Sequence, residues 1–217
     1  MPITILLAYR YPLVREGLKA VFERPTDMDV IRETDNGRDA VTLVTRLRPD
    51  VLIIDVMMPG LSGLEVTRQV RQRRPPTRVI VLSTSANVTH VLAAMRYGAA
   101  GYLLQEVSGN ELVQAVREVV AGCPYLSPVL AARLRTLQGQ RASAEVLDPY
   151  ETLTTREREV LHLAAEGRTY FEIGVILGIG FRTVETHRAH LMKKLGLRAK
   201  TDLIRYPQSH HFFYRLL

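Results

Sequence analysis

The sequence predicts two domains of different fold class: an α/β domain with a doubly wound, five-stranded parallel sheet, and a small all-α domain of four helices. In residues 1–122, short apolar runs alternate with segments of helical periodicity, which indicates a parallel sheet covered by helices on both faces. Residues 151–217 show helical periodicity only. Residues 123–150 combine one helical segment with a polar stretch, and we interpret them as a linker with one helix. A length of 217 residues suits two domains of ordinary size.

The elements of residues 1–122 follow from periodicity and from turn and cap residues. Pro12 suits the first turn of a helix, and Asn36 and Ser108 are good N-caps. The predicted helices begin near Pro12, Asn36, Gly63, Val88 and Ser108. The predicted strands are Ile3–Leu7, Asp29–Arg32, Val51–Ile54, Arg78–Ser83 and Gly101–Leu104.

The third predicted strand is apolar throughout and runs straight into Asp55, which is followed by the turn residues Pro59 and Gly60. An apolar run of this kind is typical of a central strand that is buried on both faces of a parallel sheet. Open α/β sheets carry their chemistry outside the carboxyl ends of the strands. Asp55 therefore lies where a functional carboxylate is expected.

Composition and charge limit the classes of protein to which this chain can belong. No apolar run reaches the roughly 18 residues that a membrane helix needs, and the N-terminus lacks the pattern of a signal peptide. The single cysteine, Cys123, excludes an internal disulfide and predicts a cytoplasmic protein. We expect no enzyme activity, cofactor or metal. Residues 151–217 carry 11 Lys or Arg against 7 Asp or Glu, within a net charge of +7, and this asymmetry predicts a polyanionic partner.

The C-terminal part is punctuated as a series of short helices. Thr154 with Glu157, and Thr169 with Glu172, form the pattern of two capping boxes, each of which opens a helix. A longer helix over residues 181–195 follows a glycine-containing turn, and its outward positions are basic and polar, which suits a helix-turn-helix. The four predicted helices begin at Thr154, Thr169, about Phe181 and about Lys200.

Five segments, spread over both domains, carry recognisable motifs. They are Pro12–Leu18, Asp50–Gly60, Gly98–Leu104, Leu153–Leu161 and Thr183–Leu197. The first three resemble the receiver domain, and the last two the LuxR-type helix-turn-helix domain, of bacterial response regulators of the NarL/FixJ family. The resemblance implies a flavodoxin-like receiver with Asp55 as phosphoacceptor of a two-component system. It also implies a homodimeric transcription regulator that binds promoter or operator sites in double-stranded DNA.

The receiver departs from the family pattern at its phosphorylation pocket. Family receivers hold Mg²⁺ with two acidic residues after the first strand, where this chain has Tyr9 and Arg10, and carry a lysine after the fifth strand, where it has Gln105. Ser83 and the switch aromatic Tyr102 match the family. Because phosphoryl transfer depends on neutralising the transferred charge, the sequence predicts a degenerate receiver that acts independently of aspartyl phosphorylation. The alternative is an ordinary two-component response regulator that is switched by phosphorylation of Asp55.

The pocket leaves two further interpretations open. Arg10 either pairs with Asp55, which would lower the pKa of Asp55, or points to solvent. Tyr9 and Tyr11 either fill the former acidic pocket or widen it for a small ligand. A receiver without a phosphorylation switch is expected to be biased by a protein or a small ligand, or to be fixed in one state.

The resemblance also assigns DNA contacts to the helix over residues 181–195 and to the basic segment that follows it. The residues expected near base edges or phosphates are Arg182, Thr183, Glu185, Thr186, Arg188 and Ala189, and those expected at phosphates are Lys193, Lys194, Arg198 and Lys200. Pro207 shortens the helix on which the family forms its dimer contact, so an altered dimer contact is expected. The alternatives are a solvated helix of a small bundle and an interaction module that no longer binds DNA.

Overall fold

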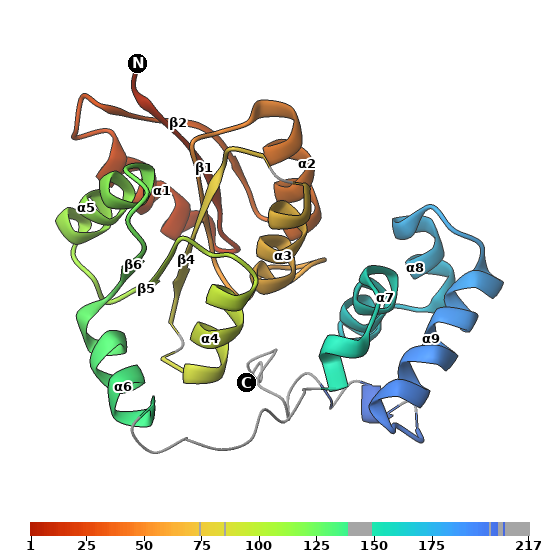
Figure 1. Cartoon of the computed structure of the whole chain (residues 1–217). Helices are drawn as coiled ribbons and strands as arrows, with labels where there is room; N and C mark the ends of the chain where they lie inside the picture. Colours follow the sequence, from red (N-terminus) through yellow and green to blue (C-terminus); the bar gives the residue numbers. More distant parts are fainter. Residues whose placement is uncertain (74, 85, 139–148, 200, 204–205, 207–217) are drawn as a thin grey trace. The chain divides into compact units, whose positions relative to one another are not determined.

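The computed structural model describes the chain except for residues 74, 85, 139–148, 200, 204–205 and 207–217. The chain divides into two compact units, Met1–Ala142 and Ser143–Leu217. The first is an α/β unit, and the described part of the second is helical (Figure 1). No helix in the described ranges is long and apolar enough to cross a membrane.

The first unit is built on one sheet in which every paired strand runs parallel to its neighbour. The strand order is β2-β1-β3-β4-β5-β6, so β1 lies between β2 and β3. All four residues of β3 are buried, as expected for a central strand between two layers of helices. The strands are β1 Ile3–Ala8, β2 Met28–Thr34, β3 Val51–Ile54, β4 Arg78–Ser83, β5 Gly101–Leu104 and β6 Tyr125–Leu126.

The sheet has one strand more than the five predicted, because β6 lies within the segment that was interpreted as a linker. It is only two residues long, so it carries no alternation of apolar and polar residues that would mark a strand. Its place is set by backbone pairing with β5, through Tyr125 N to the Ala100 carbonyl at 3.0 Å and Ser127 N to the Tyr102 carbonyl at 3.2 Å. The prediction of a five-stranded sheet is therefore corrected to six strands.

The helices cover both faces of the sheet, with α1 and α5 on one face and α2, α3 and α4 on the other (Figure 1). The two predicted N-caps form: Asn36 Oδ1 accepts from Arg38 N at 2.9 Å, and Ser108 Oγ from Glu111 N at 3.2 Å. The helices are α1 Pro12–Phe22, α2 Gly37–Leu47, α3 Gly63–Arg73, α4 Val88–Arg96, α5 Gly109–Val120 and α6 Pro128–Gln138. The last of them is the helix predicted for the linker, and residues 139–148 of that linker lie outside the described residues.

The second unit opens with the 3-10 turn η1 Pro149–Thr152, followed by α7 Thr155–Ala165, α8 Tyr170–Leu177 and α9 Phe181–Leu195. Both predicted capping boxes are present at the starts of α7 and α8. Gly178 and Gly196 adopt left-handed backbone angles, with φ of 64° and 68°, and end α8 and α9. Residues 201–203 and Tyr206 are helical where the fourth helix was predicted, and the other residues of that segment lie outside the described part.

Candidate functional site

Asp55 lies at the carboxyl end of β3, at the sheet edge where the sequence placed it. Its side chain is buried, its backbone N donates to the Ala8 carbonyl at 3.1 Å, and its carboxylate accepts from the backbone of Val56 and Met57. The loop then folds back so closely that a Cβ on Gly63 would stand 2.0 Å from the Asp55 carbonyl oxygen. Only glycine allows this approach, so the start of α3 helps to fix the position of Asp55.

The electrostatics of Asp55 separate the two interpretations left open for Arg10. Burial raises the pKa of Asp55 to about 6, although the backbone N–H groups of Met57 and Val56 and the charge of Arg10 favour its ionised form. Arg10 and Asp55, both described, form no ion pair, and the Arg10 guanidinium lies 5.3 Å from the ring centroid of Tyr11. Of the two interpretations left open for Arg10, the ion pair with a lowered pKa of Asp55 does not form. Stacking on a half-exposed ring keeps the guanidinium hydrated, which a buried pair would not.

Tyr9 occupies the position where the family has an acidic residue, and it is fully buried. The Gln105 side-chain amide donates to the Tyr9 hydroxyl, so the two residues that replace charged groups are bonded to each other. Burial, together with the charge of Asp55, raises the pKa of Tyr9 well above its usual range. The Tyr9 ring thus fills this end of the sheet, which agrees with the interpretation that aromatic rings fill the former acidic pocket. Tyr11, in contrast, is half-exposed.

The two residues that match the family are also bonded to each other. Ser83, at the end of β4, and Tyr102, in β5, are both fully buried, and their side chains share a hydrogen bond. Burial raises the pKa of Tyr102 to about 12, so its hydroxyl stays protonated over the physiological range. The hydroxyl of Ser83 therefore already has a partner inside the protein.

The structure thus brings together all of the predicted pocket residues at the carboxyl ends of β1, β3, β4 and β5. Asp55 is the only carboxylate among them, and its neighbours are two phenols, an amide, a hydroxyl and an arginine. Within the described ranges, no group of three His, Cys, Asp or Glu side chains is placed to hold a metal ion. Mg²⁺ prefers carboxylate oxygens and water in octahedral geometry, so these residues do not fit the ion that family receivers use.

In the second unit, α9 presents most of the predicted DNA-binding residues to solvent. Val184 and Leu191 are buried on the side of α9 that packs on α7 and α8, and most residues at its other positions are exposed. The predicted contact residues that are exposed are Arg182, Thr183, Glu185, Thr186, Ala189, Lys193, Lys194 and Arg198. Gly180 caps the helix without a side-chain hydrogen bond, as expected for glycine. Lys200 lies outside the described residues.

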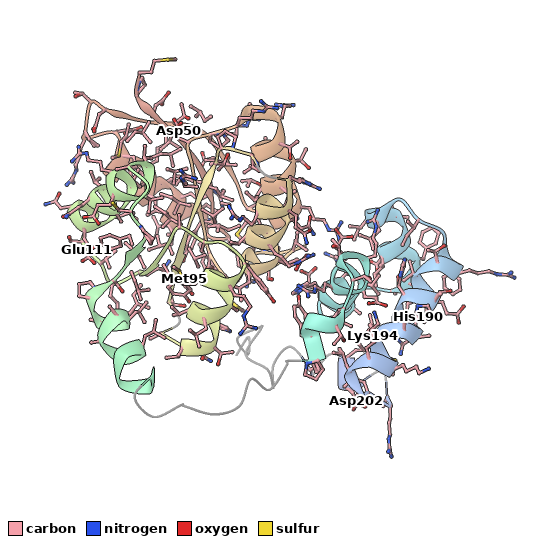
Figure 2. The ribbon with its side chains drawn as sticks, viewed as in Figure 1. Asp50, Met95, Glu111, His190, Lys194 and Asp202 are labelled. Atoms are coloured by element: carbon pink, nitrogen blue, oxygen red, sulfur yellow. The ribbon has the colours of Figure 1, made fainter. Side chains whose placement is uncertain are left out.

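Two of the predicted DNA-binding side chains, Arg188 and Lys194, contact other helices of the same unit. Lys194 donates to the Glu157 carboxylate at 2.7 Å and to the Thr152 carbonyl at 3.1 Å, which joins α9 to the start of α7. Figure 2 shows Lys194 on the last turns of α9. The Arg188 guanidinium lies 4.9 Å from the ring centroid of Tyr170. Sequence reasoning missed both contacts because their partners lie on other helices.

Each of the two units matches a known protein family. Residues 5–117 match the response regulator receiver domain, and residues 151–207 match the bacterial regulatory proteins of the luxR family. The transcriptional regulatory protein MctR of Rhizobium johnstonii is 37% identical over 208 residues, which cover 96% of this chain and 94% of MctR. LiaR of Bacillus subtilis is 35% identical over 209 residues, which cover 96% of this chain and 98% of LiaR.

Solved structures show the same architecture. The receiver domain of the response regulator NarL from Mycobacterium tuberculosis has a TM-score of 0.55 and 33% identity, covering 56% of this chain and 98% of that one. The response regulator ChrA of a heme-sensing two-component system has a TM-score of 0.54 and 28% identity, covering 98% of this chain and 99% of that one. The chain belongs to the response regulators that join a receiver domain to a LuxR-type DNA-binding domain.

Proposed function

We propose that this response regulator controls transcription through a receiver that acts independently of phosphorylation at Asp55. The observation that carries the proposal is the buried Tyr9 ring, which stands where the family has a metal-binding acid and accepts a hydrogen bond from Gln105. Restoring a metal site there would require removal of a fully buried side chain from the core. The receiver is therefore held in one state or biased by a protein or small ligand.

The chemistry of phosphoryl transfer supports this proposal. The transferred group carries charge on its oxygens, and catalysis consists mainly of positioning that group and neutralising its charge with cations. Gln105 is neutral and already bonded to Tyr9, and the Ser83 hydroxyl is bonded to Tyr102. Among the cations at this edge, Arg10 stacks on Tyr11, and Arg15 donates to the Tyr9 carbonyl oxygen at 2.7 Å. None of these groups is poised to receive a phosphoryl group on Asp55.

The output is sequence-specific binding to double-stranded promoter DNA by a cytoplasmic homodimer, with no enzymatic step. In this proposal α9 enters the major groove, so that Arg182, Thr183 and Thr186 face base edges and phosphates. Lys193 and Arg198, which are exposed, neutralise phosphates. Lys194 and Arg188 act mainly by holding α9 in place, since each is engaged with another helix of the same unit.

The second candidate function is an ordinary regulator that is switched by phosphorylation of Asp55. It is favoured by the retained position of Asp55 at the end of β3 and by the retained Ser83 and Tyr102. This alternative needs a metal or another cation to enter the pocket beside Tyr9, which the buried ring opposes.

DNA affinity separates the two functions. High-affinity duplexes are first enriched from a random pool with the untreated protein, and binding is then measured with and without acetyl phosphate and Mg²⁺, for the natural chain and for Asp55→Asn. We expect the same affinity in all four cases and a steep decrease of affinity with salt. A tenfold gain of affinity on treatment that is lost in Asp55→Asn would contradict the proposal.

A further inference from the structure

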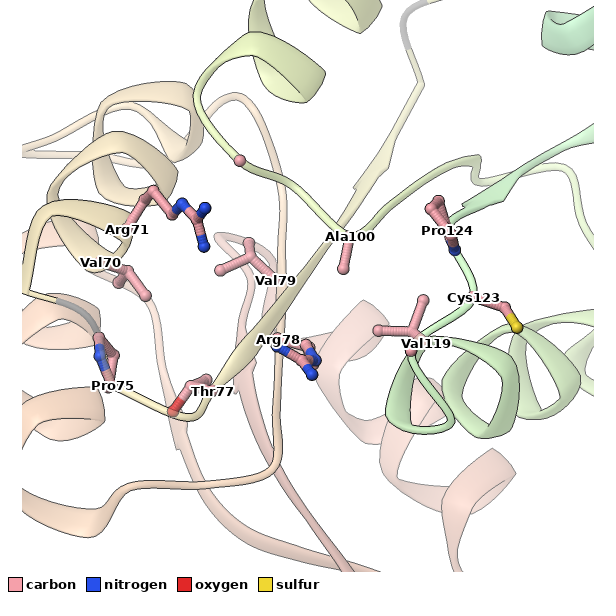
Figure 3. Close-up of a pocket in the computed structure, with 12 residues that line it drawn as sticks. Val70, Arg71, Pro75, Thr77, Arg78, Val79, Ala100, Val119, Cys123 and Pro124 are labelled. Atoms are coloured by element: carbon pink, nitrogen blue, oxygen red, sulfur yellow. The ribbon is translucent and has the colours of Figure 1, made fainter.

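The first unit carries a second polar site at the end of the sheet opposite Asp55. A cavity of about 320 Å³ opens there between the last turn of α3, the start of β4, the turn before β5 and the segment between α5 and β6 (Figure 3). We propose that this cavity binds a small multivalent oxyanion, a metabolite that bears phosphate or carboxylate groups. The proposal does not depend on how Asp55 behaves.

Charge is the first argument for an anionic ligand. Two arginines, Arg71 from α3 and Arg78 from β4, line the cavity, and none of the described residues that line it is acidic. Neither guanidinium makes an ion pair or side-chain hydrogen bond with any described residue. Guanidinium groups present several N–H donors in a fixed plane that matches carboxylate and phosphate oxygens. Two such groups beside one cavity favour a ligand with more than one negative charge.

A buried hydroxyl is the second, independent argument. Thr77 lies at the start of β4, is 7% exposed and lines the same cavity. Its Oγ1 atom is buried and makes no hydrogen bond within the described part of the protein. Buried hydroxyl groups in folded proteins almost always have a partner, so an unpaired one at a cavity wall points to a partner from outside. An oxyanion would accept the Thr77 hydrogen while Arg71 and Arg78 bind its other oxygens.

The position of Arg71 is set by the backbone facing it. A Cβ on Gly98 would stand 2.9 Å from both Cγ and Cδ of Arg71, so the arginine stem lies directly against this glycine. Gly98 also has a φ of +94°, which non-glycine residues rarely adopt. Figure 3 shows Arg71 above Val70 and Val79, at the side of the cavity away from Cys123. The stem thus packs on the backbone along one side, which reduces its conformational freedom and the entropy cost of binding.

The shape of the site favours a small molecule over nucleic acid. The volume is at the small end of the range for ligand pockets, and apolar residues such as Val70, Val79 and Val119 form part of the wall. Concave sites with a few convergent polar groups suit a compact ligand. The exposed basic residues of α9, in contrast, present a convex helix surface to a long polyanion.

The test is an NMR titration of the ¹⁵N-labelled full-length protein at constant ionic strength, with pyrophosphate in one arm, citrate in a second and a short DNA duplex in a third. The first variant is Arg71→Met with Arg78→Met, which keeps the stems and removes the charges. The second is Thr77→Val. Arg46→Ala is the control, since Arg46 is exposed on α2 and has no partner among the described residues. Thermal unfolding checks that each variant is folded.

We expect saturable shifts of the Thr77, Gly98 and Cys123 amides with pyrophosphate or citrate. The arm with the tighter affinity identifies the ligand as a phosphate-bearing or a carboxylate-bearing compound. The double arginine variant should bind at least tenfold more weakly, Thr77→Val should lose part of the affinity, and Arg46→Ala should bind as the natural chain does. Unsaturable shifts, equal losses in Arg46→Ala, or cavity shifts with the duplex alone would each overturn the proposal.

Discussion

The carboxyl edge of the receiver sheet and the outer face of α9 both derive from one family pattern, but they present their side chains in opposite ways. At the sheet edge, Tyr9 is bonded to Gln105 and Ser83 to Tyr102, so that the polar groups satisfy each other inside the protein. On α9, the predicted contact residues are mostly exposed, and within the described part of the chain most of them make no contact with another helix. The polar side chains named in the first region are paired with each other, whereas most of those in the second are exposed to solvent.

The backbone that holds the pocket residues is independent of the side chains at those positions. The strands that carry the pocket are joined by backbone bonds: Asp55 N to the Ala8 carbonyl, Tyr9 N to the Thr34 carbonyl and Gln105 N to the Ser83 carbonyl. None of these bonds depends on the side chain at Tyr9 or Gln105. A metal-binding acid and a lysine can therefore be exchanged for a phenol and an amide without change of the sheet.

The largest effect is expected from Tyr9→Ala, which tests whether the sheet edge is packed shut. Removal of a fully buried ring leaves a cavity and should lower the free energy of unfolding by about 3–5 kcal/mol. Tyr9→Phe keeps the ring, loses only the bond from Gln105 and should cost about 1 kcal/mol. Urea denaturation of both variants measures the difference. Equal, small losses in both would show that Tyr9 is not part of the core.

Asp55→Asn should act in the opposite direction and make the receiver more stable at pH 7. The pKa of Asp55 is about 6 in the folded protein against 3.8 when unfolded, so the folded state binds the proton more tightly. Stability contributed by this group is present below about pH 4 and is lost as the pH rises to about 6, a change of about 3 kcal/mol. Asparagine removes this loss. Urea denaturation from pH 4 to 7 should give a flatter profile for Asp55→Asn, and unchanged pH dependence would contradict a buried carboxylate with a raised pKa.

A smaller effect separates two neighbouring lysines of α9. Burial raises the pKa of Glu157, but hydrogen bonds from Lys194 and the Thr154 backbone outweigh it and hold that pKa below its usual range. Lys194→Ala leaves Glu157 without its cation and should cost about 1–2 kcal/mol of stability at pH 7, after allowance for partial exposure. The salt dependence of DNA binding should be the same in Lys194→Ala as in the natural chain.

Lys193→Ala is the matched control, because Lys193 is exposed. It should leave stability unchanged and reduce the slope of log affinity against log salt by about 1. Binding assays over a salt series, together with thermal unfolding, measure both quantities. The reverse outcome, a stable Lys194→Ala with a reduced slope, would assign Lys194 to the DNA instead.

Local chemistry made much of the fold predictable. The caps at Asn36 and Ser108, the capping boxes at Thr154 and Thr169 and the apolar run before Asp55 each depend on residues close in sequence, and each formed as predicted. The two-residue strand β6 was not predicted because it forms by pairing with a strand that is distant in sequence. Tyr125 of β6 pairs with Gly101 of β5, 24 residues earlier. A strand of that length has no periodicity to detect.

The sequence predicted which residues form the candidate site, but not which of their side chains contact each other. The positions of Tyr9, Gln105 and Asp55 at strand ends followed from the order of strands. The bond between Tyr9 and Gln105, across 96 residues, and the stacking of Arg10 on Tyr11 depend on side-chain rotamers and burial, which a sequence does not specify. The same holds for Lys194 and Glu157, which are 37 residues apart.

The central claim, that the receiver does not work through phosphorylated Asp55, is tested most directly by intact mass spectrometry after incubation with acetyl phosphate and Mg²⁺. Asp55→Asn is the negative control. A variant that restores the family pattern, Tyr9→Asp, Arg10→Asp and Gln105→Lys, is the positive control once circular dichroism shows it to be folded. We predict no phosphoryl adduct on the natural chain and an adduct on the restored variant. A stable adduct on the natural chain that is absent from Asp55→Asn would contradict the claim and establish phosphorylation of Asp55 as the input.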